Sequence, residues 1–337
     1  MTTEIAVLDD YENVAHAYGG WDTIPDARVR IFNRRLGTAD ELVDGIGSAS
    51  VLVAMRERTR IDDSLLTRLP GVRLLVVTGS HNNRAVDIPA ARRRGITVCG
   101  TGGGFAAAGE MTWALILGLA KHVTRADACV RAGQPLPAAG RDLSGARLGV
   151  VGFGKLGRAV ARVGEAFGMD VVTWSPHISE SYVAGTSVRV VSKKELFAGS
   201  DFVTLHMVYS RSTERMIGAA ELGWMSPSAY FVNTSRGRLV DEEALITCLQ
   251  SGGIAGAGLD VFRQEPLSPD SPLTALPNVL LSPHVGYATE GTLRVFYRDI
   301  VEDVRDYLAG RPARVLAVDS EGAISGFAAY DQPKGIP

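Results

Sequence analysis

A glycine-rich turn between a strand-like and a helix-like segment constrains the fold of this chain more than any other feature. The short apolar run at residues 147–151 leads into the pattern G-x-G-x-x-G at residues 152–157. Apolar residues then recur at spacings of four, three and four from Leu156 to Phe167, and Gly168 follows, which predicts an amphipathic helix. A second apolar run at residues 171–174 completes a strand, turn, helix, strand order, which is typical of a dinucleotide-binding unit.

The glycines of this pattern have separate physical tasks. One permits a tight turn, one lets a pyrophosphate approach the backbone, and one allows close helix packing, while the helix N-terminus faces the phosphate charge. The pattern therefore predicts cofactor contacts at Gly152, Gly154, Lys155, Leu156 and Gly157.

The acidic residue that usually follows the second strand of such a unit is missing. An Asp or Glu there bonds the ribose hydroxyls of NAD and would repel the 2′-phosphate of NADP. This chain instead has Ser175, Pro176 and His177, with Lys193 and Lys194 further on. We therefore predict cofactor contacts at residues 175–177 and expect NAD(P), with NADP slightly favoured because Ser175 replaces the acid. The alternative, that Ser175 and Pro176 only form a turn, stays open.

Three further segments each follow a short apolar run that predicts a strand. They are N-T-S-R-G at 233–237, D-V-F-R-Q-E-P at 260–266 and S-P-H-V-G at 282–286. In an open α/β sheet the ligand lies at such strand ends. An arginine can hold a carboxylate by two parallel hydrogen bonds, and a histidine oriented by a glutamate can exchange a proton with a carbonyl or hydroxyl oxygen. These residue types favour redox chemistry on a 2-oxo or 2-hydroxy acid over the alternative, a buried polar network that only stabilises the fold.

In this order, the glycine pattern and the three motifs resemble the D-isomer-specific 2-hydroxyacid dehydrogenase family over residues 4–316. The resemblance is to members like the glyoxylate/hydroxypyruvate reductases and phosphoglycerate dehydrogenases. It implies that Arg236 binds the substrate carboxylate, that Glu265 polarises His284, and that His284 is the acid/base. The activity implied is hydride transfer between NAD(P)H and C2 of a 2-oxo or D-2-hydroxy acid.

The resemblance also implies contacts outside the three catalytic residues. The substrate carboxylate would meet backbone N–H groups of the loop Thr78, Gly79, Ser80 and His81, together with Arg236. The remaining cofactor contacts would be Met207, Thr234, Ser235, Asp260, His284 and Gly286.

Alternation of strand-like and helix-like segments predicts an α/β fold. The family resemblance implies two Rossmann-like domains with parallel sheets, the cofactor domain being inserted into a flavodoxin-like substrate domain. Residues 1–100 and 286–337 would form the substrate (catalytic) domain, and residues 101–285 the NAD(P)-binding Rossmann domain, through which the chain would form a homodimer. Residues 319–337 are predicted to be a mobile tail.

Composition excludes several other classes of protein. A net charge of −2 and a pI near 6.3 give no basic field for nucleic acid. The longest apolar stretch, residues 111–120, is too short to cross a bilayer. The three cysteines have no metal-ligand spacing and no signal peptide is evident, so we expect no metal and a reducing, cytoplasmic location.

Two alternatives to the 2-hydroxy acid function stay open. Dehydrogenases of compact anions such as phosphite or formate also resemble this family. The same fold also serves as a non-catalytic, NAD(H)-sensing binding protein that keeps much of the catalytic set.

Overall fold

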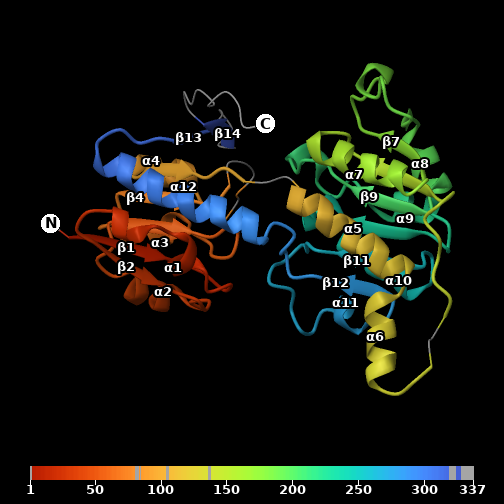
Figure 1. Ribbon diagram of the computed structural model, residues 1–337, viewed down its shortest axis with the longest axis horizontal. Coiled ribbons are helices and arrows are strands. Elements are labelled where there is room, and N and C mark those ends of the chain that lie inside the picture. The colour runs from red at the N-terminus through yellow and green to blue at the C-terminus, as the bar shows by residue number, and fades with distance from the viewer. Residues whose placement is uncertain are drawn as a thin grey trace. The chain divides into compact units, whose positions relative to one another are not determined.

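The computed structural model describes residues 2–79, 83, 85–103, 106–135, 138–318 and 324–327. Contacts divide the chain into two compact units, labelled by their elements in Figure 1. Unit 1 comprises Met1–Gly104 and Thr289–Pro337, and unit 2 comprises Phe105–Ala288. Each unit has one large, wholly parallel sheet with helices on both faces, and unit 2 is inserted into unit 1. The predicted fold class is confirmed.

Unit 1 has a five-stranded sheet in the order β2-β1-β3-β4-β5, which is the flavodoxin-like order. All of its pairings are parallel. The strands are β1 (Thr3–Val7), β2 (Ala27–Ile31), β3 (Val51–Ala54), β4 (Leu74–Val77) and β5 (Thr97–Gly100). The residues of β3 and β4 are all buried, as expected for strands that helices cover on both faces.

The helices of unit 1 fall into two groups. They are α1 (Ala15–Tyr18), α2 (Ala39–Ile46), α3 (Asp63–Thr67), α4 (Ile88–Arg93) and α12 (Glu290–Leu308), with the short 3-10 helix η1 (Trp21–Thr23). Buried side chains of α2, α3 and α4 share one core cluster with the sheet. In contrast, α12 contacts β4 and α1, so residues from the C-terminal part of the chain complete this unit.

A two-stranded antiparallel sheet follows α12. Its strands are β13 (Leu316–Val318) and β14 (Ile324–Phe327). Leu316 is fully buried in the core of unit 1, and Phe327 packs against the same core. The prediction of a mobile tail is therefore wrong for residues 324–327, because Phe327, the cross-strand partner of Leu316, packs against the core.

Unit 2 has a seven-stranded sheet in the order β12-β11-β10-β9-β6-β7-β8. The strands are β6 (Arg147–Val151), β7 (Asp170–Trp174), β8 (Arg189–Val190), β9 (Phe202–Leu205), β10 (Tyr230–Asn233), β11 (Gly256–Leu259) and β12 (Val279–Leu281). Because β6 lies between β7 and β9, the strand order reverses beside the end of β6. Ligands of doubly wound sheets bind at such a reversal.

Two layers of helices cover this sheet, and α6 (Val123–Arg131), none of whose residues is buried, belongs to neither layer. The other helices are α5 (Ala106–Ala120), α7 (Lys155–Ala166), α8 (Lys193–Gly199), α9 (Ala219–Trp224), α10 (Glu242–Gln250) and α11 (Pro272–Ala275), with 3-10 helices η2 (Glu180–Tyr182), η3 (Arg211–Thr213) and η4 (Gly237–Leu239). Helices α5 and α7 share one core cluster, and α8, α9 and α10 share the other. Figure 1 shows α5 and α7 side by side on one face of the sheet.

Helix α7 forms as predicted, but only part of its apolar stripe is buried, namely Val160 in the core and Leu156 packed against it. Val163 and Phe167, expected in the core, are each 40% exposed. The buried positions include Gly157 and Gly164 instead. A Cβ at Gly164 would lie 2.8 Å from Leu148 Cδ2, so the backbone of α7 lies directly on the sheet. Apolar spacing alone therefore located only part of the buried face, because glycines make the closest contact.

Candidate functional site

The predicted site residues of unit 2 follow the carboxyl ends of its strands. Gly152 follows β6 and Ser175 follows β7, while Asp260 follows β11. His284 lies three residues beyond the end of β12. Since all of these strands are parallel, their carboxyl ends share one edge of the sheet. The arrangement therefore gathers the predicted cofactor and catalytic segments of this unit at a single edge.

The glycine turn has the geometry that a phosphate site requires. Gly152 has φ +94°, and a Cβ there would lie 2.7 Å from the His206 carbonyl oxygen. A Cβ at Gly157 would lie 2.1 Å from the Gly152 carbonyl oxygen, whereas one at Gly154 would meet nothing within 4 Å. Gly154 is the N-cap of α7, which begins at Lys155. Two glycines are thus needed for the packing of the turn, and the third leaves open space at a helix N-terminus, where a pyrophosphate fits.

Glu265 and His284 form a direct pair. His284 Nδ1 lies 2.6 Å from Glu265 Oε2. The other carboxylate oxygen, Oε1, accepts a hydrogen bond of 2.9 Å from the Phe262 N–H, so the backbone holds the glutamate. The two side chains are 17% and 28% exposed. Since Nδ1 is engaged, Nε2 is the imidazole atom that can exchange a proton with a ligand.

Asp260 holds the backbone turn that carries His284. Its carboxylate accepts hydrogen bonds from the N–H groups of Val285 at 3.0 Å and Gly286 at 2.9 Å. The aspartate is almost fully buried, and this burial raises the pKa of its carboxyl group despite the hydrogen bonds. His284 itself has φ +56°, a conformation that residues other than glycine adopt only when their surroundings enforce it. The geometry thus assigns Asp260 a positioning task beside the predicted cofactor contact.

Arg236 lies on a loop that packs against the segment of the glutamate. Asn233 closes this loop, because its Nδ2 donates to the Arg236 carbonyl oxygen at 3.0 Å. The Arg236 Nη1 donates to the Ser235 carbonyl oxygen at 2.7 Å. A Cβ at Gly237 would lie 1.9 Å from the Phe262 carbonyl carbon, so only glycine fits there. The backbones of the arginine motif and the glutamate motif are therefore in direct contact.

Side-chain hydroxyls link the loops at the remaining predicted cofactor contacts. Ser235 Oγ donates to the Met207 carbonyl oxygen at 2.6 Å, which connects the loop after β9 to the loop after β10. Thr234 Oγ1 lies 2.7 Å from Thr112 Oγ1 on α5, and both threonines are buried. The contact of Thr112 with Thr234 was not predicted, since the sequence marks Thr112 only as one residue of a helix.

A second histidine lies at the same edge but has a different environment. His206 Nε2 lies 2.9 Å from Thr204 Oγ1, and burial lowers the pKa of the imidazole to about 3. Its Nδ1 is buried without a hydrogen-bond partner among the described residues. His206 is consequently neutral at physiological pH, and of these two histidines only His284 is paired with a carboxylate.

The segment after β7 forms the turn that was the alternative interpretation. The Ile178 N–H donates to the Ser175 carbonyl oxygen at 3.3 Å. Pro176 and His177 are exposed. The Ser175 hydroxyl has no hydrogen bond within the described ranges, so the turn leaves it available to a ligand. Lys193, a suggested phosphate partner, is instead engaged with Glu221 Oε1 at 2.7 Å.

Sequence reasoning missed Arg158, the residue that follows the last glycine of the pattern. Its guanidinium carbon lies 5.4 Å from the centroid of the Phe153 ring and 5.7 Å from that of the Tyr182 ring. The available signal was its place in the first turns of α7, beside a predicted phosphate site.

The predicted substrate loop of unit 1 is only partly described. The Thr78 N–H donates to the Ala54 carbonyl oxygen at 3.1 Å, and the Gly79 N–H donates to Thr101 Oγ1 at 2.8 Å. Ser80 and His81 lie outside the described residues. Gly79 has φ +87°, and a Cβ there would lie 2.1 Å from the Arg56 Nη1. Both described amides thus donate within unit 1, and an arginine lies against the loop.

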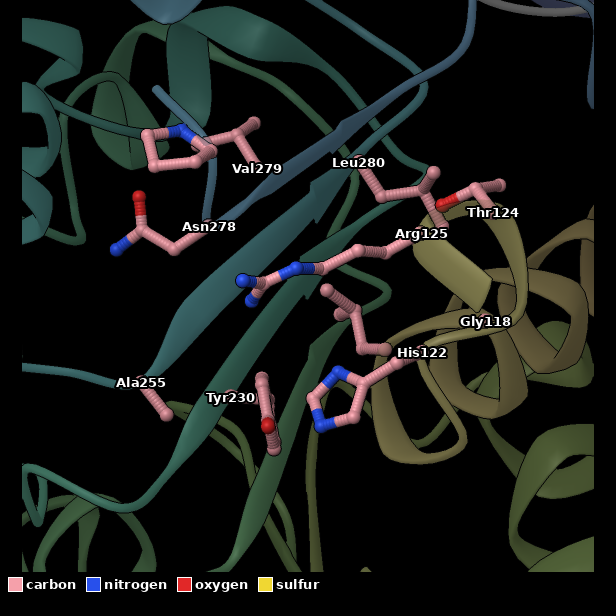
Figure 2. A pocket seen from close by; sticks show the side chains of 11 residues that line it. Gly118, His122, Thr124, Arg125, Tyr230, Ala255, Asn278, Val279 and Leu280 are labelled. Carbon is pink, nitrogen blue, oxygen red and sulfur yellow. The ribbon is translucent and has the colours of Figure 1, made fainter. Parts of the chain in front are cut away.

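A pocket of about 220 Å³ lies elsewhere in unit 2, as Figure 2 shows. It is lined by the first residues of β10 and β12, Tyr230 and Val279, so it lies at the amino ends of the strands, opposite the edge described above. His122 and Arg125 reach into it from the region of α6 (Figure 2).

Within the described ranges, no group of three or more His, Cys, Asp or Glu could hold a metal, and no helix is long and apolar enough to cross a membrane.

A parallel α/β unit with an open glycine turn at a helix N-terminus defines a dinucleotide-binding protein. The family model described as "D-isomer specific 2-hydroxyacid dehydrogenase, NAD binding domain" matches residues 113–286, which lie within unit 2. The chain belongs to the D-isomer specific 2-hydroxyacid dehydrogenase family, as its motifs predicted.

Individual relatives cover most of this chain. A glyoxylate reductase of Aeropyrum pernix is 39% identical over 245 residues, which are 69% of this chain and 72% of that protein. A D-3-phosphoglycerate dehydrogenase of Synechocystis sp. is 35% identical over 81% of this chain, which spans only 50% of that protein. The crystal structure of a phosphoglycerate oxidoreductase from Vibrio cholerae is 33% identical, with a TM-score of 0.85, and covers 92% of this chain and 100% of that one.

Proposed function

We propose that this protein is an NAD(P)-dependent dehydrogenase of the CH–OH group that interconverts a 2-oxo acid and a D-2-hydroxy acid. The observation that carries the proposal is the 2.6 Å contact between Glu265 and His284 at the sheet edge that also bears the open glycine turn. Residues 101–285 would hold the cofactor, and residues 1–100 with 286–337 would form the substrate domain. The match of the NAD-binding family model to residues 113–286 supports this division.

The three catalytic residues have separate tasks. Arg236 holds the substrate carboxylate through its guanidinium. In reduction, the charged His284 donates the proton on Nε2 to the 2-oxo oxygen, and in oxidation the neutral ring accepts the hydroxyl proton. Glu265 orients the imidazole and stabilises its charged form. The bound nicotinamide supplies or takes up the hydride at C2.

Residues of unit 2 would hold the cofactor at the strand ends. The glycine turn with Lys155 and Leu156 would bind the pyrophosphate. The remaining contacts would be Met207, Thr234, Ser235, Asp260, His284 and Gly286. Ser175 replaces the acidic residue that would repel a 2′-phosphate, so we infer a slight preference for NADP, with NAD also accepted.

The substrate would be a small carboxylate held by Arg236 and by the loop Thr78, Gly79, Ser80 and His81. The described amides of Thr78 and Gly79 already have acceptors within unit 1. We also infer a homodimer formed through the cofactor domain. Helix α6 supports it, because none of its residues is buried and Val130 is 73% exposed.

The absorbance of NADPH and NADH, followed separately against a panel of 2-oxo acids, tests the proposal. His284→Ala should lower turnover by about 10²- to 10⁴-fold, the usual contribution of a general acid. The exposed His16 on α1 provides the control, and His16→Ala should keep wild-type turnover.

Each other outcome has a defined meaning. An unchanged rate in His284→Ala would overturn the assignment of the acid/base. Oxidation of only phosphite or formate would select the compact-anion alternative. Cofactor binding without turnover of any donor or acceptor would indicate an NAD(H)-sensing protein.

A further inference from the structure

We propose that Arg158 is the residue that recognises the 2′-phosphate of NADP in this chain. The inference rests on the proposed function and deepens it. Ser175 removes the charge that would repel the 2′-phosphate, and Arg158 would bind that phosphate. Arg158 lies on α7, directly after Gly157, and is exposed. The cofactor-binding turn and this arginine therefore belong to one continuous segment.

Two aromatic rings lie near the Arg158 guanidinium. The guanidinium carbon lies 5.4 Å from the Phe153 ring centroid and 5.7 Å from the Tyr182 ring centroid. Its Nε also lies 3.4 Å from the Phe153 carbonyl oxygen. Phe153 is a buried residue of the glycine turn itself. An arginine held between two rings loses less side-chain freedom when it binds an anion than a mobile surface cation does.

The arginine borders the segment that replaces the usual acidic residue. Ser175 begins this segment, and two turns lead from it to Tyr182, since Ile178 N–H bonds the Ser175 carbonyl oxygen and Tyr182 N–H bonds the Ser179 carbonyl oxygen. The Tyr182 ring then contacts Arg158. The stretch from Ser175 to Tyr182 thus begins directly after β7 and ends at a residue whose ring contacts Arg158.

The charges around Arg158 leave it available to a phosphate. The Nη nitrogens of Arg158 have no hydrogen bond or ion pair with any residue in the described part of the chain. Lys193, one of the two lysines suggested from the sequence, is bound to Glu221. A guanidinium offers two parallel N–H groups that match phosphate oxygens, and NAD has only a hydroxyl at that position. The arrangement therefore favours NADP by attraction as well as by the missing repulsion.

Equilibrium binding of NADPH and NADH to purified protein tests this proposal without any substrate. Titration of nicotinamide fluorescence should show the Kd for NADPH rising at least about tenfold in Arg158→Ala, the loss expected for one charge-assisted contact. The Kd for NADH should stay within about twofold. Arg162 is the matched control, since it is exposed one turn further along α7, and Arg162→Ala should change neither Kd.

Two further measurements keep the test decisive. Adenosine 2′,5′-bisphosphate should compete with NADPH better than ADP in the wild type, and this advantage should vanish in Arg158→Ala. If Arg158→Ala does not fold by circular dichroism, Tyr182→Leu removes one of the two rings and should weaken NADPH selectively, by a smaller factor.

Equal losses for NADPH and NADH, no loss for either, or the same loss in Arg162→Ala would overturn the assignment and leave Arg158 a purely structural contact. The result is separable from the proposed function. Selective loss of NADPH in a protein that turns over no 2-oxo acid would refute only the activity. Unchanged selectivity in an active reductase would refute only the role of Arg158.

Discussion

The two units use the same local contact for different purposes. In unit 2, Asp260 Oδ2 accepts the N–H of Gly286 at 2.9 Å, and in unit 1 Asp299 Oδ2 accepts the N–H of Gly102 at 2.8 Å. Both aspartates are buried. Neither glycine could carry a side chain without crowding the carboxylate, since a Cβ would lie 2.7 Å from Asp260 Oδ2 and 3.0 Å from Asp299 Oδ2.

The difference lies in what else each carboxylate bonds. Asp260 Oδ1 accepts a second backbone N–H, that of Val285, so both of its oxygens hold one turn, the turn of His284. Asp299 Oδ1 instead pairs with the exposed Arg298 at 2.7 Å. Asp260, which bonds only neutral N–H groups at a strand end, fixes the turn of His284. The imidazole of this histidine must be able to gain and lose a proton. Asp299, which is paired with Arg298, anchors the backbone at Gly102 and holds no catalytic residue.

The largest difference between the two aspartates should appear in turnover. Asp260→Ala leaves two buried N–H groups without an acceptor and frees the turn of His284, so turnover should fall about 100-fold, as a misplaced catalytic group costs. Stability should also fall by ~1–3 kcal/mol for each unpaired N–H. Asp299→Ala should destabilise the chain while turnover of the folded protein stays near wild type. Steady-state kinetics with urea unfolding separate the two effects, and an active Asp260→Ala enzyme would contradict the positioning task.

Those parts of the fold and of the candidate site that depend on short segments could be predicted from the sequence. The strand, glycine turn and helix at residues 147–167 form as predicted, since the turn and the helix depend on residues that are close together in the sequence. The parallel order of β10, β11 and β12 then follows from alternating elements, and strands that run in parallel end at one edge. The placement of Arg236, Glu265 and His284 at this edge follows from their distance from strand ends, whereas their roles were implied by the family resemblance.

The rest depends on contacts between distant residues. Asp260 was predicted only as a cofactor contact, because nothing in the sequence shows that its carboxylate reaches residues 285 and 286. Arg158 was missed because its second ring, Tyr182, lies beyond an entire strand and turn. The apolar spacing gave no sign that Phe167 is 40% exposed, because glycines, which carry no apolar signal, make the closest packing of α7.

The carboxylate site of unit 1 should also respond to pH. Near Asp299, the buried Asp303 bonds Arg314 Nε at 3.0 Å, but its Oδ2 has no partner among the described residues. Burial, partly offset by Arg314, raises the pKa of Asp303 from 3.8 to about 8. The folded chain therefore holds a proton that the unfolded chain releases. This contribution to stability is complete below about pH 4 and is lost as the pH rises to about 8.

Asp303→Asn removes this titration. Relative to the variant, the wild type should lose stability between pH 5 and pH 8, at no more than ~1.4 kcal/mol per pH unit. Urea unfolding of both proteins at pH 5, 6.5 and 8 measures the slope. A constant difference between the stabilities of the two proteins across this range would show that Asp303 does not titrate there.

The smallest effects should come from filling the space beside the two glycines. Gly286→Ala brings a methyl group to 2.7 Å from Asp260 Oδ2 and to 3.3 Å from Met111 Cβ, so neither side can yield easily. We expect it to cost ~1–3 kcal/mol, the usual range for overpacking. Gly102→Ala meets Asp299 Oδ2 at 3.0 Å and then only Val295 Cγ1 at 3.6 Å, so a small shift of the carboxylate relieves it and the cost should be smaller. Thermal and urea unfolding of both variants measure the two costs. A larger loss in Gly102→Ala would mean that the anchor of unit 1 is the more rigid of the two.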